Sequence, residues 1–232
     1  MATCLLCGSQ EFTDRGGRKF CASCKAGGRT QLLGYAMRNA VPASDSKLPV
    51  IHISPEGALV RIMKTRFGDA WTPADFDPPR WERARNGRPV QFCDLSEPAK
   101  FYPPESVQGF VHSHVLEHIP VPMDKVLSEM NAAVEPGGFH AFIVPGPFPD
   151  HYDEDLGPLS PEERVTRFGH PEHMRHFGRL DWPEVVLRHF EGWRQIPMSS
   201  YITPDQLRGA NIPAGQTLDK LTGTTVHLFV KP

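Results

Sequence analysis

The chain alternates short apolar runs with segments of helical periodicity, and this alternation limits the possible folds more than any other feature. Apolar runs with the length of buried strands occur at 48–53, 70–74, 90–93, 107–112 and 139–144. Between them, 55–67 and 121–134 repeat apolar residues at helical spacing. Such alternation is typical of a largely parallel sheet that is covered by helices on both faces.

Segments on either side extend this pattern. A helix is expected at 31–38, and a linker follows it at 41–47. Further along the chain, 182–190 has the pattern of an amphipathic helix, and 194–198 and 226–230 have the pattern of a final strand pair. The intervening residues 199–223 show no clear periodicity, so no element is predicted there.

Four of the five cysteines form two C-x-x-C pairs that are thirteen residues apart. Each pair can place two thiolates on one metal ion, and two pairs complete a tetrahedron. We therefore predict a structural zinc ion bound by Cys4, Cys7, Cys21 and Cys24. Two redox motifs are the alternative, but such motifs open helices, whereas these pairs lie in short glycine-rich stretches. Cys93 is expected to be a small buried apolar residue.

The charge of the chain argues against a polyanionic partner. Its 232 residues carry a formal net charge of −2, so no global basic field attracts nucleic acid or anionic lipid. No apolar run approaches the roughly 18 residues of a membrane span, and the first residues lack the pattern of a signal peptide. We expect a cytoplasmic protein with no membrane association, in which thiols without metal stay reduced. The oligomeric state stays open.

Acidic residues recur at the ends of the predicted strands. In open parallel sheets, ligands bind beyond the carboxyl ends of the strands. The residues that follow successive strands are 54–57, 75–77, 94–95 and 113–114, and three of these four segments carry a carboxylate. This recurrence fits a nucleoside that is held through its ribose hydroxyls and its adenine amine.

Two motifs carry a family resemblance. The stretch S-H-V-L-E-H-I at 113–119 and the stretch V-E-P-G-G at 134–138 resemble the signature of the type 11 subgroup of class I S-adenosylmethionine-dependent methyltransferases. The stretches 51–56 and 74–78 are similar to a bacterial branch in which a zinc ribbon precedes the catalytic domain. The resemblance covers essentially the whole chain.

The resemblance implies a fold and a domain organisation. The implied fold is α/β, a Rossmann-like class I methyltransferase fold with a mostly parallel seven-stranded sheet and a small N-terminal zinc ribbon. The ribbon and a linking helix occupy 1–40, and the methyltransferase domain occupies 41–232. A lid is inserted into this domain at about 145–180.

The resemblance also assigns the contacts of the cofactor, S-adenosylmethionine. They come from the ends of four strands and comprise Ser54, Glu56, Gly57, Asp75, Asp94, Leu95, Ser113 and His114. The turn that contains Ser54, Glu56 and Gly57 passes under the methionine part of the cofactor, and Asp75 holds the ribose. Asp94 and Leu95 contact the adenine. Ser113 and His114 line the floor of the site near the sulfonium. One departure from the family is the first turn, usually G-x-G-x-G, in which glycine is here replaced at 54, 56 and 58.

The long polar segment 145–179 follows the fifth predicted strand, where long loops act as lids or substrate platforms. Within it, 168–178 resembles the family's F-G-Q-x-D-H-V-R-x-Y-G segment. The resemblance implies that His173 is a general base for a hydroxyl acceptor and that Arg175 holds an anionic or sugar-bearing acceptor. Hydrogen bonding within the lid is the alternative for His173. The pair His114 and His118 has metal-ligand spacing, but packing around the strand end is the favoured interpretation.

The favoured function is O-methylation of a small-molecule or glycan-type acceptor. One alternative is an RNA methyltransferase whose zinc ribbon grips RNA, against which stand the net charge and the lack of a basic stripe. Another alternative is a non-catalytic zinc-binding scaffold on a methyltransferase fold, for which the altered glycine turn is the support.

Overall fold

A seven-stranded sheet forms the centre of the computed structural model, which describes residues 1–81, 88–213, 218 and 220–232. The strand order is β10–β11–β7–β6–β3–β4–β5. The strands are β3 (Val50–Ile53), β4 (Trp71–Asp75), β5 (Gln91–Phe92), β6 (Val107–Ser113), β7 (Val134–Ile143), β10 (Arg194–Gln195) and β11 (His227–Val230). Strands β3 to β7 are parallel, and β11 runs antiparallel to both β7 and β10. The predicted mostly parallel seven-stranded sheet is therefore confirmed.

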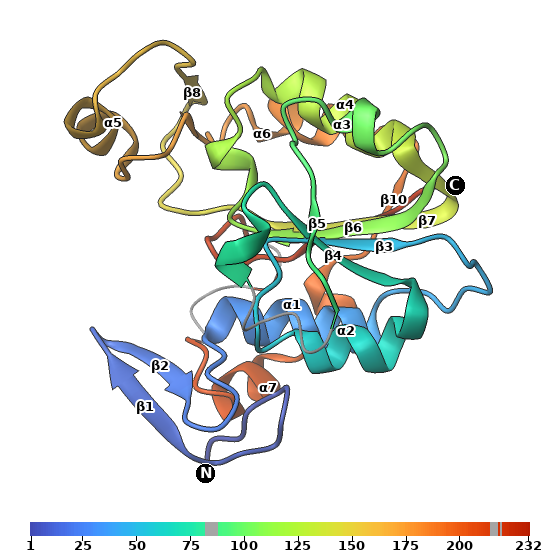
Figure 1. Ribbon diagram of the computed structural model, residues 1–232. Helices are drawn as coiled ribbons and strands as arrows, with labels where there is room; N and C mark the ends of the chain where they lie inside the picture. Colours follow the sequence, from blue (N-terminus) through green and yellow to red (C-terminus); the bar gives the residue numbers. More distant parts are fainter. Residues whose placement is uncertain (82–87, 214–217, 219) are drawn as a thin grey trace.

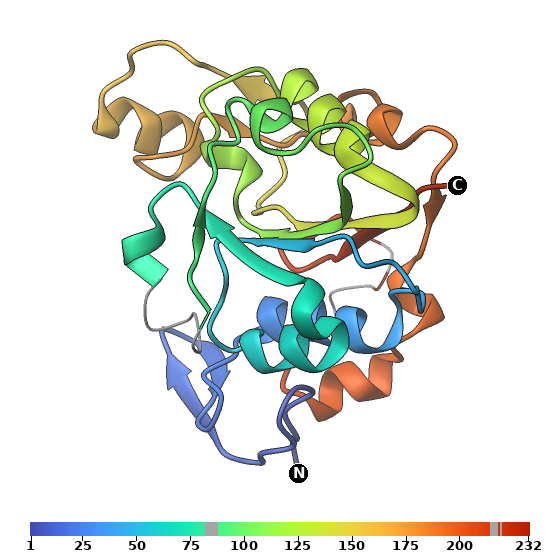
Figure 2. The same cartoon turned by 45° about the vertical axis from the view of Figure 1, so that its right-hand side comes forward.

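Helices cover the sheet on both faces, as Figures 1 and 2 show. The helices α1 (Gly28–Asn39) and α2 (Val60–Phe67) lie on one face. On the other face lie α3 (Pro98–Phe101), α4 (Met123–Ala133) and α6 (Trp182–Val185). Within the described residues, no helix combines the length and the apolar character that are needed to cross a bilayer.

The predicted element boundaries fail where local signals compete with packing. The helix expected from residue 55 begins only at Val60, because the preceding residues form a turn after β3. Strand β7 begins at Val134 and runs through the P-G-G stretch that was expected to precede it. A Cβ atom on Gly138 would lie 2.4 Å from the Gln108 carbonyl oxygen, so glycine here permits the close approach of β7 to β6.

The cysteine module and the sheet share one apolar core. Cys4, Leu6 and Cys21 are buried in the same cluster as residues of α1, α2 and β7. A Cβ atom on Gly34 of α1 would lie 2.6 Å from the Leu6 side chain and 2.8 Å from that of Leu59, so these elements pack closely. Helix α1 thus belongs to the helical layer, and the domain division that we predict at residue 40 crosses a continuous core.

The segment 199–223, for which no element is predicted, forms a second connection to the module. It contains α7 (Pro204–Gly209), which begins with a capping box at Thr203. The backbone N–H of Thr3 donates a 2.6 Å hydrogen bond to the carbonyl oxygen of Gly209. Residues 214–217 and 219 of this segment lie outside the described residues.

Buried histidines form an unusual part of the core. The Nε2 atoms of His112 and His140 are 2.9 Å apart, and His140 Nδ1 is 2.7 Å from the Asn131 side-chain oxygen. Burial lowers the pKa of His52, His112 and His227 to about 3, and lowers the pKa of His140 well below its usual value. All four rings are therefore neutral in the folded protein at neutral pH.

These histidines predict an acid-sensitive fold. A histidine with a lowered folded-state pKa stabilises the protein fully above its unfolded pKa of about 6.5, and this stability is lost as the pH falls toward 3. Each such ring should lower the free energy of unfolding by about 1.4 kcal/mol per pH unit below 6.5. Denaturant unfolding at pH 7.5 and pH 5.5 measures the effect.

The variant His227→Phe isolates one ring, since His227 packs between aromatic neighbours with ring centroids at 4.7 Å (Trp182) and 5.1 Å (Phe142). As the pH falls below 6.5, the free energy of unfolding of wild type should decrease more steeply than that of this variant, by about 1.4 kcal/mol per pH unit. The exposed His151 gives the control, because His151→Ala should leave the pH dependence unchanged. Equal pH dependence in wild type and His227→Phe would contradict the prediction.

Candidate functional site

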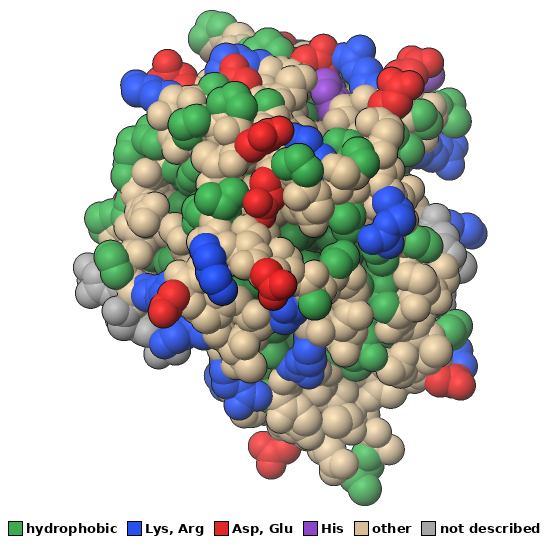
Figure 3. Space-filling model, turned by 90° about the vertical axis from the view of Figure 1, so that its right-hand side faces the viewer, with side chains coloured by type: hydrophobic (Ala, Val, Ile, Leu, Met, Phe, Trp, Pro, Cys, Tyr) green, Lys and Arg blue, Asp and Glu red, His purple; other side chains and the backbone are tan. Residues whose placement is uncertain are grey.

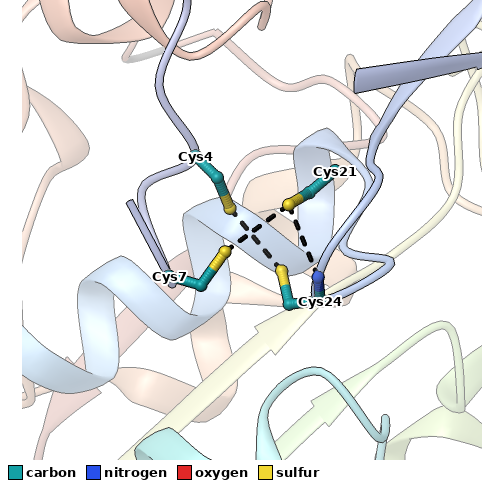
Figure 4. A group of neighbouring side chains, drawn as sticks. All are labelled: Cys4, Cys7, Cys21 and Cys24. Carbon is teal, nitrogen blue, oxygen red and sulfur yellow. Dashed lines mark hydrogen bonds between the residues drawn. The ribbon is translucent and has the colours of Figure 1, made fainter. Parts of the chain in front are cut away.

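The four paired cysteines converge on one point beside the hairpin β1 (Phe12–Arg15) and β2 (Arg18–Cys21), as Figure 4 shows. The sulfur atoms of Cys4 and Cys24 are 3.6 Å apart, and those of Cys7 and Cys21 are 3.5 Å apart. A tetrahedral zinc ion with bonds of about 2.3 Å separates its sulfurs by roughly 3.8 Å. The arrangement of the thiols therefore fits the predicted zinc ion.

The thiols need a cation in order to ionise together. Burial raises the pKa of Cys4 and Cys24. Burial acts in the same direction on Cys21, but hydrogen bonds from the Cys24 and Ser23 backbones and the Cys7 thiol outweigh it and lower the pKa of Cys21 to about 7. A divalent ion at the centre of the four sulfurs would offset their mutual repulsion and stabilise the fold of the module.

The carboxyl ends of β3, β4 and β6 meet at one edge of the sheet. Because these strands pair in parallel, Ser54, Asp75 and Ser113 come to lie at this edge. The Ser54 hydroxyl donates a 2.6 Å hydrogen bond to Asp75 Oδ2, and the Asp77 N–H donates to Asp75 Oδ1 at 2.8 Å. The structure thus brings together the predicted methionine and ribose contacts.

Two residues at this edge hold a left-handed backbone conformation. Ser54, which follows β3, has a φ of 50°, and His114, which follows β6, has a φ of 57°. Residues other than glycine seldom adopt this conformation, and such strain clusters at ligand sites. Ser54 therefore adopts a backbone conformation that glycine usually provides, although no glycine stands at this position.

Glu56 contacts Arg29 and Thr30, two residues that no motif in the sequence singles out. Arg29 Nε lies 3.5 Å from Glu56 Oε1, and the Thr30 hydroxyl donates to the same oxygen at 3.2 Å. Burial raises the pKa of Glu56, while the charge of Arg29 lowers it. Arg29 and Thr30 begin helix α1, directly after the cysteine module. No local signal could have found them, since the contact spans 26 residues of sequence.

The predicted adenine contacts, Asp94 and Leu95, follow the adjacent strand β5, which ends at Phe92. The Cys93 N–H donates to the Asp75 carbonyl oxygen, which places Asp94 next to the end of β4. Asp94 Oδ1 accepts a 2.8 Å hydrogen bond from the Ser96 N–H, and Leu95 is buried. Gly57 is exposed in the turn after β3.

Several buried polar atoms at this edge have no hydrogen-bond partner among the described residues. They are Glu56 Oε2, Ser113 Oγ, His114 Nε2 and both carboxylate oxygens of Glu117. Burial raises the pKa of Glu117 to about 8 and lowers that of His114 to about 3. Buried polar groups are ordinarily satisfied by protein, water or ligand, so these atoms make the edge a candidate binding site.

Arg175 anchors the segment 145–180, which is predicted to be a lid. The lid contains β8 (Asp153–Glu154), α5 (Pro161–Phe168) and β9 (Arg175–His176). Arg175 is fully buried, and its Nε donates to Glu154 Oε2 at 2.8 Å. Its other nitrogens donate to the carbonyl oxygens of Leu116, Ile119 and Val121. Through these contacts, Arg175 fastens the predicted lid to the sheet edge.

His173, the predicted base, lies in the lid beside two other histidines. Its ring centroid is 4.8 Å from that of His118 and 4.6 Å from that of His170. Burial and the neighbouring rings lower the pKa of His173 to about 4. His173 is therefore neutral at neutral pH and a weak base.

The cysteine site generates a prediction about metal content and stability. Cys21→Ser should bind one equivalent of zinc less than wild type, because the remaining three thiols no longer complete the tetrahedron. A loss of about 3 kcal/mol in stability would lower Tm by roughly 6–12 °C in a chain of this size. Metal analysis by mass spectrometry and calorimetric melting measure both effects. Cys93→Ala serves as the control and should keep the wild-type zinc content, so equal zinc loss in both variants would argue against the site.

Comparison with known proteins gives structural relatives only. No family model matches the sequence, and no curated protein matches it either. A S-adenosylmethionine-dependent methyltransferase from Mesorhizobium loti superposes with a TM-score of 0.52 at 15% identity, covering 84% of this chain and 94% of that chain. Such identity shows similarity of fold.

Two archaeal structures give the same result. The putative methyltransferase in complex with the Trm112 methyltransferase activator from Haloferax volcanii has a TM-score of 0.51 at 15% identity, covering 86% of this chain and 87% of that chain. A SAM-dependent methyltransferase from Archaeoglobus fulgidus has a TM-score of 0.50 at 14% identity, with coverage of 88% and 94%. Together with the strand order, these matches show that the chain has the fold of the class I S-adenosylmethionine-dependent methyltransferases.

Proposed function

We propose that the protein is a S-adenosylmethionine-dependent methyltransferase that methylates a hydroxyl group of a small-molecule or glycan-type acceptor. The observation that carries this proposal is the concentration of buried, unpartnered polar atoms among the described residues at the carboxyl edge of β3 and β6. Ligands of open parallel sheets bind at this edge. A polar ligand there would satisfy groups whose burial is otherwise unfavourable.

The chemistry of the edge residues fits the parts of the proposed cofactor. Asp75 would accept hydrogen bonds from the ribose hydroxyls, and Asp94 with Leu95 would meet adenine. Glu56 and Arg29 offer opposite charges for the ammonium and carboxylate groups of the methionine part. The cofactor, when bound, supplies a methyl group on a sulfonium. The residues of this chain would bind the cofactor, orient its methyl group toward the acceptor and exclude water.

A cavity between the segment that begins with α6 and the start of β11 has the size for a small acceptor. Its volume is about 330 Å³, and its walls include Trp182, Leu187, Met198 and His227. Pockets for small molecules have volumes in this range and mostly apolar walls. His227 pairs with Phe142 near the carboxyl end of β7, so the cavity lies toward the same edge of the sheet. We propose His173 as the residue that accepts the hydroxyl proton when no metal ion occupies its Nε2 atom.

The proposal predicts binding of the cofactor in the absence of acceptor. Calorimetric titration of S-adenosylmethionine and S-adenosylhomocysteine into the zinc-loaded protein should give micromolar dissociation constants. Asp75→Asn keeps the size of the side chain but removes the charge that strengthens hydrogen bonds to the ribose, and so should weaken binding by about 10-fold to 100-fold.

Asp69 provides the matched control for Asp75. It lies before β4, at the opposite end of the same strand, and its side chain is exposed. Asp69→Ala should bind both ligands like wild type. Absence of binding by the folded wild-type protein would refute the proposal and leave the scaffold alternative in first place.

The surface does not favour the RNA alternative. On the face shown in Figure 3, basic and acidic side chains are interspersed and do not form a stripe. Because a phosphate backbone is bound mainly through clustered positive charge, we expect no retention of the protein on a heparin column at low salt. Retention that decreases steeply with salt concentration would instead support an RNA acceptor.

A further inference from the structure

Three histidines converge where the lid meets the sheet edge. His118 ends a short 3-10 helix (Leu116–His118) after β6, and His170 and His173 lie between α5 and β9. Each ring offers a nitrogen atom, and these three atoms all lie within 4.8 Å of one another. All three side chains are partly exposed, so an ion can reach them from solvent.

Backbone hydrogen bonds orient two of the rings. His118 Nδ1 lies 3.2 Å from the Glu172 carbonyl oxygen, and His173 Nδ1 lies 3.3 Å from that of Phe168. A carbonyl oxygen can only accept, so each Nδ1 carries the proton and each Nε2 presents a lone pair. Histidines that bind metals are commonly held in this way.

The third ring is held differently. The Glu172 N–H donates to His170 Nδ1 at 3.2 Å, which leaves the proton on Nε2. Ligation through Nε2 therefore requires the proton to move to Nδ1 and this long hydrogen bond to break. The ring of His170 stacks on that of His173 at an interplanar angle of 28°, so it must also tilt as it binds an ion.

A buried carboxylate beside the histidines points independently to a cation. Glu117 is fully buried, and neither of its oxygens has a hydrogen-bond partner among the described residues. Its Oε1 lies 3.8 Å from His118 Nε2. Buried carboxyl oxygens without hydrogen-bond partners are unfavourable, and a cation bound at the histidines would give them an electrostatic partner.

We propose that His118, His170 and His173 bind a divalent transition-metal ion, with Glu117 as its anionic neighbour. Three imidazoles favour Zn²⁺, Co²⁺ or Ni²⁺ over Mg²⁺ and Ca²⁺, which prefer oxygen ligands. Three protein ligands also leave a coordination position open to water or to an acceptor oxygen. The site is distinct from the four-cysteine site and does not depend on the proposed methyl transfer.

The ion would join the lid to the core of the domain. His118 belongs to the sheet edge, whereas His170 and His173 belong to the lid. Two hydrogen bonds already run beside the site, one from the Met174 N–H to the Glu117 carbonyl oxygen and one from the Arg175 guanidinium to the Leu116 carbonyl oxygen. A bound metal would therefore reinforce an existing junction between the two segments.

Metal counting tests the site. The full chain, without a histidine tag, is equilibrated with Zn²⁺ and analysed by mass spectrometry. Wild type should bind two equivalents, and His118→Ala, His170→Ala and His173→Ala should each bind one. The control His151→Ala removes an exposed lid histidine outside the cluster and should keep two. His170 is only partly buried and lies outside the apolar core clusters, so its variant tests the site without endangering the core.

Cobalt identifies the ligands. Co²⁺ titrated into protein whose cysteine site is already filled with zinc should give visible d–d absorption without a thiolate charge-transfer band. Glu117→Gln should weaken this Co²⁺ binding about 10-fold, because it removes the negative charge beside the ion. A single zinc equivalent in wild type, a second equivalent that survives all three histidine substitutions, or a thiolate band with cobalt would each overturn the proposal.

Discussion

The parallel pairing of β4, β3 and β6 is the constraint on which the site depends. Parallel strands present all their carboxyl ends at one edge, so residues that are far apart in sequence must meet there. The chain leaves each strand abruptly at that edge, and Ser54 and His114 take up left-handed conformations as a result. At the same strand ends, polar side chains are buried without hydrogen-bond partners among the described residues. These side chains are available to a ligand that binds at the edge.

The parallel strands of the sheet could be predicted from the sequence because most of them are short apolar runs of the right length. Once the ends of these strands were placed, the acidic residues that follow them could be predicted to lie at one edge of the sheet. Other parts could not be predicted. The pairing of Arg29 with Glu56 depends on how α1 packs, which no local pattern encodes. Arg175 illustrates a different limit: a motif singles out this residue, but only the structure shows that its guanidinium donates to the carbonyl oxygens of Leu116, Ile119 and Val121.

The cysteine module is connected to the sheet edge through α1. Its buried cysteines share a core with that helix, and Arg29 and Thr30 at the start of the helix contact Glu56. A metal ion that stabilises the module would therefore also fix the position of Arg29. This coupling gives the module a physical role at the proposed cofactor site that requires no separate partner.

The histidine cluster limits what His173 can do. Its Nδ1 faces the Phe168 carbonyl oxygen, so the ring has one free lone pair, on Nε2. That lone pair can accept a proton from an acceptor hydroxyl or bind a metal ion, but not both at once. Its lowered pKa already makes His173 a weak base. Occupancy of the proposed metal site would therefore exclude His173 as the base, and the hydroxyl proton would have to pass to another group at the edge.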